Sequence, residues 1–227
     1  MFSVLKKALP VALTLSAALG AQAQFYKLHG ASVSVGATGN YLETLTSNAT
    51  PVTFNTVTPQ GVTLTNTVSG QTQYNTSSLG FLTSLQFHPV PWAGIEVNYG
   101  YQHYQERYSY YLASSPVRMG TNVPTTTHEA TGAYQFHPKH IPFQPFVNIG
   151  GGAIDFVPTL GGPNQWRGAG LLETGFDIVM PGTQRKLALR IQGRGLFYRA
   201  PNFNNAALST RSWRVSAEPN ASFVYRF

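Results

Sequence analysis

Acidic and basic side chains recur at even spacings on two neighbouring segments of this chain. Glu173 and Asp177 lie four residues apart, and Arg190 and Arg194 are separated by the same interval. An even spacing puts both members of a pair on one face of a β-strand. A hairpin that turns within residues 181–186 sets Asp177 opposite Arg190 and Glu173 opposite Arg194. This pattern indicates ion pairs in an interior, where an unpaired charge costs several kcal/mol.

Other charged residues fall on the corresponding faces of further strand-like segments. We predict one network of inward charges, made of Glu96, Glu129, Glu173, Asp177, Arg190, Arg194, Glu218 and Arg226. If eight strands enclose these residues, side chains about fill the interior, which favours a salt-bridged plug. A gated ion path, and hence a small ion-conducting pore, is the alternative.

Histidine and serine residues raise the question of catalysis, because a hydrolase needs a Ser–His–acid set near one rim of the molecule. His103 and His128 lie near the ends of two strand-like segments, and Ser109, Ser114 and Ser115 lie in the connection between them. No recognisable motif joins these residues. We therefore expect no enzyme activity and no catalytic residue.

Three further histidines fall near short connections, where they are candidates for a metal site. His88, His137 and His140 each lie close to a proline, and no carboxylate accompanies them. Residues of this kind are common in turns, whereas metal sites combine several nitrogen, sulfur or oxygen ligands at set distances. We expect no metal site and no cofactor.

The elements that must position these side chains are strands, because apolar and polar residues alternate along the chain. Eight such segments are separated by turn-forming residues. We predict strands at Tyr26–Leu42, Tyr74–Phe87, Ala93–Tyr104, Thr126–Phe136, Phe143–Ile154, Gly168–Met180, Lys186–Tyr198 and Trp213–Phe227. Two residues break the pattern: Phe146 falls on the polar face, and Pro219 requires a bulge or a strand end.

The polar face of these strands is unusually small. It is rich in Gly, Ser, Asn and Gln, as in the fifth segment, where Asn148 and Gly150 alternate with Val147 and Ile149. A soluble β-sandwich is the structural alternative, but its polar face meets water and usually carries many charges. Small polar side chains instead suit the confined lumen of a narrow barrel.

The connections alternate between short and long. Phe87, Phe136, Met180 and Phe227 end the even-numbered strands at intervals of 49, 44 and 47 residues, and the connections that follow the first three are short. We therefore predict an all-β, eight-stranded antiparallel up-and-down transmembrane barrel with short periplasmic turns. The long extracellular loops would be residues 43–73, 105–125, 155–167 and 199–212.

The N-terminus has the three parts of a secretory signal peptide. Lys6 and Lys7 precede an apolar stretch at residues 8–19, and Ala21 and Ala23 supply a small-x-small cleavage site. The apolar run is too short for a membrane-spanning helix. We assign residues 1–23 to the signal and residues 24–227 to one barrel domain.

Composition excludes several other classes of protein. The chain has no cysteine, so neither a disulfide framework nor lipidation on cysteine is available. Removal of Lys6 and Lys7 from the 15 basic residues leaves 13 against 8 acidic ones. These basic residues are scattered rather than gathered in a run or stripe, so we expect no nucleic-acid partner.

The last strand carries aromatic residues on one face up to its final position. Phe223, Tyr225 and Phe227 alternate with smaller or polar residues, and this ending resembles the C-terminal sorting signal of bacterial outer-membrane barrels. With eight strands placed, the chain resembles the small outer-membrane barrel family that includes the OmpA transmembrane domain and OmpX. Residues 145–152 are similar to the fifth strand of that family, and residues 223–227 to the last.

This resemblance implies a monomer in the bacterial outer membrane with a structural or surface-interaction role in the envelope. During biogenesis it implies periplasmic chaperones and the barrel-assembly machinery as partners, with Phe223, Tyr225 and Phe227 as the recognised signal. Lipid A-modifying enzymes also occur on eight-stranded barrels, which keeps an enzyme as a further alternative.

Basic residues outnumber acidic ones in the predicted outer loops. We expect them to contact outer-membrane lipids, above all lipopolysaccharide phosphates, and the tyrosines at residues 104–111 leave an adhesin open as an alternative. The predicted extracellular basic residues are Arg107, Arg118, Arg167, Arg199, Arg211 and Arg214.

Overall fold

The computed structural model describes residues 30–47, 51–113, 117–138 and 143–227. The predicted signal peptide at residues 1–23 lies outside these ranges. So do three of the candidate site residues, Ser114, Ser115 and His140. Within the described ranges, no helix is long and apolar enough to cross a membrane.

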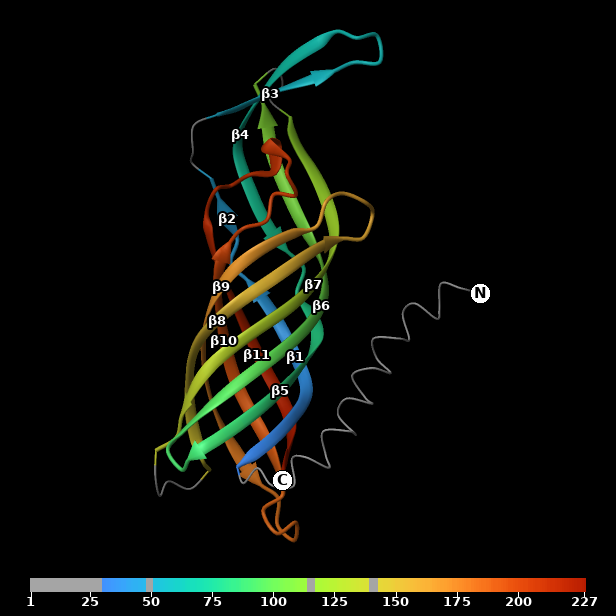
Figure 1. Ribbon diagram of the computed structural model, residues 1–227. Coiled ribbons are helices and arrows are strands. Elements are labelled where there is room, and N and C mark those ends of the chain that lie inside the picture. The colour runs from blue at the N-terminus through green and yellow to red at the C-terminus, as the bar shows by residue number, and fades with distance from the viewer. Residues whose placement is uncertain (1–29, 48–50, 114–116, 139–142) are drawn as a thin grey trace, which may run out of the picture.

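Eight antiparallel strands form a closed ring, which confirms the predicted fold (Figure 1). β1 pairs with β5 on one side and with β11 on the other, so the sheet closes on itself. Every other neighbour in the ring is also a neighbour in sequence, as an up-and-down barrel requires. The ring strands are β1 (Ala31–Leu42), β5 (Ser78–Val90), β6 (Ala93–Leu112), β7 (Arg118–Phe136), β8 (Pro145–Pro158), β9 (Gln165–Val179), β10 (Leu187–Arg199) and β11 (Trp213–Arg226).

The alternation of side chains is inverted relative to a soluble protein. Leu79 is 81% exposed and Tyr134 66% exposed, although both are large and apolar. Gln135 and Asn148, by contrast, are completely buried inside the ring. Because successive residues point to opposite faces, each strand carries an apolar outer face and a polar inner face.

Two glycines allow the wall to curve sharply between β7 and β8. A Cβ atom at Gly150 or at Gly152 would lie 2.0 Å from a backbone oxygen of β7. No side chain fits at that distance, so only glycine permits so close an approach of the two strands.

Two of the predicted long loops are largely sheet, which corrects the sequence-based boundaries. The segment at residues 43–73 contains β2 (Leu45–Thr46), β3 (Val52–Val57) and most of β4 (Thr63–Asn75), and β4 pairs with the outer part of β6. The segment at residues 105–125 continues β6 and β7 as one hairpin, with pairing up to Tyr111 and Arg118. A sheet of β3, β4, β6 and β7 therefore projects from the end of the barrel opposite the C-terminus (Figure 1).

The expected interruption of the last strand at Pro219 is absent. β11 runs through this residue, which is paired with Gly193 of β10. On the β1 side, the pairs of Thr38 with Asn220 and Tyr41 with Ala217 keep one register. The β1–β11 ladder is therefore interrupted next to Pro219, but the register of the two strands is the same before and after it.

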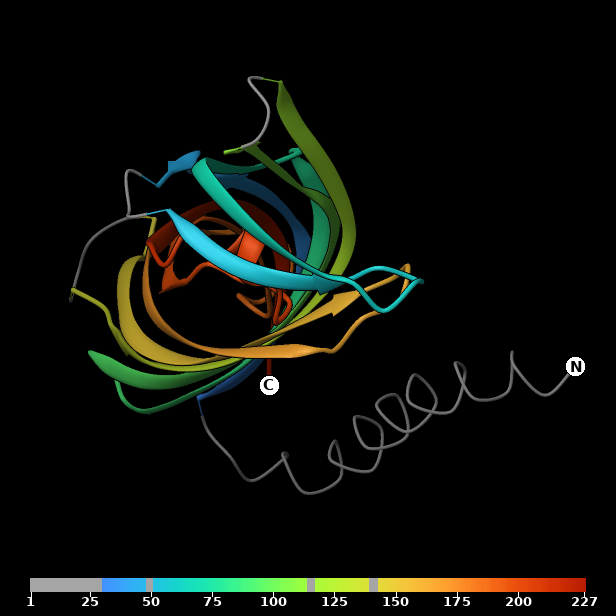
Figure 2. The ribbon, with the colours of Figure 1, turned by 90° about the horizontal axis from the view of Figure 1, so that it is seen from above.

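The connection between β10 and β11 is largely buried, although Asn204 and Asn205 in its middle are exposed. It includes a short 3-10 helix, η1 (Ala206–Leu208), and lies within the outline of the ring when the molecule is seen from above (Figure 2). Phe203, Ala207 and Leu208 are buried there. The segment therefore forms part of the filling of the barrel.

Candidate functional site: the filled lumen

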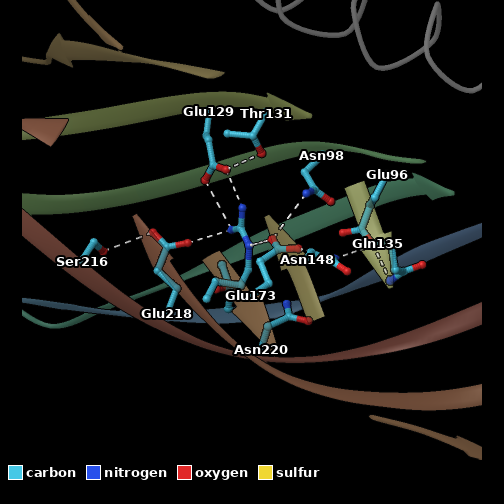
Figure 3. Close-up of polar contacts among 12 residues, drawn as sticks. Glu96, Asn98, Glu129, Thr131, Gln135, Asn148, Glu173, Ser216, Glu218 and Asn220 are labelled. Atoms are coloured by element: carbon cyan, nitrogen blue, oxygen red, sulfur yellow. Dashed lines mark hydrogen bonds and ion pairs between the residues drawn. The ribbon is translucent and has the colours of Figure 1, made fainter. Parts of the chain in front are cut away.

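A single guanidinium group lies at the centre of the lumen and contacts three carboxylates. Arg194 of β10 donates hydrogen bonds to Glu129 of β7, Glu173 of β9 and Glu218 of β11. Figure 3 shows these three glutamates directed toward one guanidinium. The Arg194 side chain has no exposed surface, and Glu173 lies opposite it in the β9–β10 ladder, the register expected from the sequence.

A second guanidinium group lies one layer closer to the C-terminal end of the barrel. Arg190 donates two hydrogen bonds to Asp177, of 2.7 and 3.1 Å, and one of 3.1 Å to Glu96. Its guanidinium carbon lies 4.2 Å from the centre of the Phe146 ring. The cation–π contact explains why Phe146 points inward, against the pattern of its strand.

Neutral amides complete this layer. Gln86, Gln135 and Asn148 each donate a hydrogen bond to Oε2 of Glu96, at 2.9, 3.2 and 3.2 Å. Asn148 also donates to Glu173 at 2.6 Å. Hydrogen bonds of this kind are needed to keep charged groups in an interior.

The network has more carboxylates than guanidinium groups. Arg226 of β11 joins it through a 2.8 Å contact with Asp177, and its side chain is 27% exposed at the C-terminal end of the barrel. In the part of the chain that the structure describes, five carboxylates thus share three arginines. The structure brings together all eight side chains of the predicted inward network.

One predicted extracellular residue is placed wrongly by the sequence reasoning. Arg214 is completely buried, and its guanidinium donates a 2.6 Å hydrogen bond to Glu106, which is also buried. Even numbering along β11 puts Arg214 on the same face as Ser216 and Glu218, so it points inward. The sequence does not predict its partner, because Glu106 falls in the predicted loop at residues 105–125, which the structure shows as the outer half of β6.

The other predicted basic residues lie at or near the surface and form no single cluster. Arg118, Arg199 and Arg211 are exposed, whereas Arg107 and Arg167 are half-buried. Arg118 donates to Thr72 at 2.9 Å, and Arg167 donates to Asn202 at 3.4 Å. Arg199 lies over the ring of Trp213, 5.8 Å from its centre.

An aromatic and aliphatic layer lies between the charges and the outer opening. Phe156, Leu171, Leu196 and Tyr198 of the wall form a buried cluster that also includes Phe203 of the β10–β11 connection. These side chains replace the polar lining that an open channel requires. Outside them, the connection itself closes the opening.

Hydrogen bonds hold the β10–β11 connection in place. The carbonyl oxygen of Pro201 accepts hydrogen bonds from Tyr108 at 2.9 Å and from Gln73 at 3.1 Å. The side chain of Gln165 donates to Asn202 at 2.8 Å and accepts from the backbone of Phe203 at 3.1 Å. The connection is thus tied to β4, β6 and β9.

Little space remains between the charged and aromatic layers. A cavity lined by Tyr104, Glu129 and Glu218, among others, has a volume of about 10 Å³. This is room for about one water molecule. A larger cavity, of about 1180 Å³, opens at the C-terminal end of the barrel and reaches Asp177, His88 and His137.

The candidate catalytic residues are not brought together. Nδ1 of His128 lies 2.8 Å from the hydroxyl of Tyr99, and Nδ1 of His103 lies 3.1 Å from that of Thr126. Ser109 pairs with Gly120, eight residues along the hairpin from the Tyr101–His128 pair, or roughly 26 Å at ~3.3 Å per residue. The other two serines lie outside the described residues.

The aromatic residues of the last strand face outward. Phe223, Tyr225 and Phe227 are 62%, 40% and 40% exposed, and the rings of Tyr225 and Phe227 pack edge to face with their centres 5.2 Å apart. The backbone nitrogen of Phe227 donates to Ala31 at 3.1 Å, at the seam where β11 meets β1.

Comparison with known proteins finds similar structures but no matching sequences. No family model and no curated protein matches the chain. Solved structures that are similar include neisserial surface protein A, with 14% identity, a TM-score of 0.47 and coverage of 88% of this chain and 100% of that one. They also include Ail, the attachment invasion locus protein of Yersinia pestis, in complex with the heparin analogue sucrose octasulfate, with 10% identity, a TM-score of 0.43 and coverage of 88% and 99%.

A third similar structure is that of the outer membrane protein AlkL in lipid bilayers, with 15% identity, a TM-score of 0.40 and coverage of 88% and 92%. These values are too low to carry any statement about function. By its own closed ring, strand register and inverted faces, the chain has the architecture of the small outer-membrane β-barrels, OmpX-like proteins among them.

Proposed function

We propose that this protein is a non-enzymatic integral protein of the bacterial outer membrane, exported by its signal peptide and acting in envelope structure or surface interaction. The observation that carries this proposal is the inverted distribution of side chains. Apolar residues such as Ile149 and Leu172 are about half exposed on the outer face, while Arg190, Arg194 and Glu173 are buried inside.

The closed ring and the inverted distribution of side chains together argue against a soluble β-sandwich. In a sandwich, the apolar face of one sheet is covered by a second sheet. Here a single sheet closes on itself, so nothing in the described chain covers the outer apolar face. An apolar face that surrounds a whole ring is rare on a soluble monomer, because water would contact it. In a membrane, the hydrocarbon layer covers such a face.

Two layers of filling support a plug in preference to a pore. The inner layer consists of the charges held by Arg190 and Arg194, and the outer layer consists of the aromatic cluster and the β10–β11 connection. Conductance in planar bilayers tests this part of the proposal. We expect no large steady currents from the folded protein, and large steady pores would contradict the plug.

Outward-facing arginines support a contact with lipopolysaccharide phosphates. Arg118, Arg199 and Arg211 are exposed toward the outer end, where guanidinium groups can donate charge-assisted hydrogen bonds to phosphate. Replacement of all three by glutamine should weaken binding of lipopolysaccharide to the protein in micelles. Arg214 is left unchanged in this variant, because its guanidinium is buried against Glu106 and cannot contact lipopolysaccharide.

The projecting sheet of β3, β4, β6 and β7 favours adhesion as a second candidate function. Tyr111, Arg118 and Met119 are exposed on it, far from the lipid-facing part of the ring. Exchange of the β6–β7 hairpin end for a short turn, followed by a cell-binding assay, separates an adhesin from a passive membrane protein. Unchanged binding would remove the adhesion candidate.

Fractionation tests the proposed location. The folded barrel should be found in the outer-membrane fraction and should migrate differently on gels before and after boiling. Its absence from that fraction would defeat the proposal. Assembly would be guided by periplasmic chaperones and the barrel-assembly machinery acting on Phe223, Tyr225 and Phe227, and the closed seam between β1 and β11 supports a monomer.

A further inference from the structure

Two histidines and a glutamine converge at the periplasmic end of the lumen. Nε2 of His88 lies 2.9 Å from Nε2 of His137 and 2.6 Å from Oε1 of Gln135. The two imidazole rings have their centres 4.9 Å apart and are tilted by 57°. His88 belongs to β5, whereas Gln135 and His137 lie at the end of β7, so the contact spans the intervening strand β6.

Gly94 of β6 allows this contact. A Cβ atom at this position would lie 2.6 Å from Cδ2 and 3.0 Å from Nε2 of the His88 ring, and 2.8 Å from a backbone oxygen. Any larger residue would therefore push the imidazole away from β7. The glycine leaves a passage across the strand, through which His88 reaches the other two side chains.

Nε2 of His88, Nε2 of His137 and Oε1 of Gln135 are all able to accept a hydrogen bond, and too few protons are present to satisfy all three. The amide of Gln135 donates through Nε2 to Glu96 at 3.2 Å, which turns its Oε1 acceptor toward His88. A neutral His88 carries one ring proton. On Nε2 it can be donated to Oε1 of Gln135 or to Nε2 of His137, whereas on Nδ1 it is directed at the carbonyl oxygen of Gly30, 3.3 Å away. With the proton on Nδ1, a cation between the three atoms would engage a lone pair of each.

We propose that His88, His137 and Gln135 form a binding site for a borderline divalent cation such as Zn²⁺. Imidazole nitrogen suits Zn²⁺, Cu²⁺ and Ni²⁺, and an amide oxygen is an acceptable third ligand. With metal–ligand bonds of about 2.0–2.1 Å, neighbouring ligand atoms lie roughly 2.9–3.4 Å apart. The 2.9 Å between the two nitrogens falls in this range, and the 2.6 Å between Nε2 of His88 and Oε1 of Gln135 is a few tenths of an ångström shorter.

The surroundings support binding from the periplasmic side. His88 and His137 line the cavity of about 1180 Å³, which gives a path of entry and room for water as a further ligand. The inference departs from the sequence-based expectation of no metal site. It uses two histidines and an amide, whereas no group of three or more His, Cys, Asp or Glu that suits a metal occurs in the described ranges.

The site bridges two strands that are not neighbours in the ring. Binding would therefore stabilise the folded barrel at its periplasmic end in proportion to metal occupancy. This inference goes beyond the proposed membrane role and does not depend on it, because binding is measured on the isolated folded chain.

Calorimetric titration tests the proposal. The tag-free mature protein, folded in detergent micelles and treated with a chelator, is titrated with Zn²⁺ at neutral pH, and heat-dependent gel mobility confirms the fold of each variant. We expect one Zn²⁺ per chain, with affinity at least about tenfold weaker in His88→Asn, His137→Asn and Gly94→Ala. Matched controls are His103→Asn, which removes an exposed histidine in the middle of β6, and Gly193→Ala, whose added Cβ meets nothing within 4 Å.

The outcomes separate a metal site from a hydrogen-bonded pair. Electron paramagnetic resonance of the Cu²⁺-loaded protein should show two nitrogen ligands, and only one in either histidine variant. Absence of saturable binding at millimolar Zn²⁺ would mean that the pair only shares a proton, which overturns the proposal. Full affinity in either histidine variant, or in folded Gly94→Ala, would overturn it as well.

Discussion

Replacement of Arg194 by methionine should destabilise the barrel more than the loss of any other charged side chain in the lumen. Methionine keeps much of the volume of the stem, so the change removes the charge and its hydrogen bonds while leaving little cavity. Glu129, Glu173 and Glu218 then remain buried without their common cation. Removal of one partner of a buried ion pair costs about 3–5 kcal/mol, and the Arg194 side chain has no exposed surface through which water could screen the loss.

The charge balance of the network predicts an asymmetry between acidic and basic replacements. Five carboxylates share three arginines, so loss of a carboxylate charge should be tolerated far better than loss of a guanidinium. Glu96→Gln is the matched variant, because the four side chains that donate to Glu96 all contact Oε2 and none contacts Oε1. An amide at this position keeps the accepting oxygen, and we expect a change of at most about 1 kcal/mol in either direction.

The assay is equilibrium unfolding in urea with the barrel inserted in lipid vesicles. Arg194→Met should lose about 3–5 kcal/mol at about pH 8, and less at about pH 4, because protonation removes the uncompensated charges of the carboxylates. Arg211→Met, at an exposed site, should change the free energy of unfolding little. Equal losses for Arg194→Met and Glu96→Gln, or a loss for Arg194→Met that grows on acidification, would refute the reasoning.

The outer face, the aromatic layer and the last residue of the chain each give one further prediction. Ile149→Arg, on the outer face, should cost about 2–4 kcal/mol in bilayers if this residue lies near the membrane midplane, and urea unfolding measures it. Phe156→Ala, in the completely buried aromatic layer, should cost about 3–5 kcal/mol in the same assay, and a loss below ~1 kcal/mol would contradict tight packing there. Deletion of Phe227 should impair assembly in cells far more than export, which fractionation of cells measures, and normal membrane insertion of the deletion variant would contradict its role as a signal.

The alternation of apolar and polar residues in the sequence predicts those parts of the strands that have lipid on one side and the lumen on the other. There the apolar and polar environments alternate with period two, and the pairing of Asp177 with Arg190 follows from one hairpin register. Beyond the membrane the outer face of a strand also meets water, while inward residues such as Glu106 and Tyr108 stay buried, so apolar and polar residues no longer alternate. Residues 105–112 therefore carry no strand signal, although hydrogen bonds with β4 and β7 make them a strand.

The error in the candidate site has the same origin. Arg214 follows the numbering of the inward residues on its strand, although its residue type indicates the outer rim. Its partner Glu106 lies in a segment whose structure depends on contacts between distant parts of the chain. The meeting of His88 with His137 could not be predicted either, because it depends on a glycine that leaves space across a third strand.

The central claim is that the outer apolar face of the ring meets lipid and the inner polar face is a filled lumen. The absence of cysteine allows single spin labels to be placed cleanly at Val147, Asn148 and Ile149 of β8 in bilayers. Collisions with oxygen, which dissolves in lipid, should be frequent at Val147 and Ile149 and rare at Asn148, and a water-soluble nickel complex should reach none of the three. Frequent collisions of the nickel complex at Val147 and Ile149, or loss of the alternation between the two faces, would contradict the account.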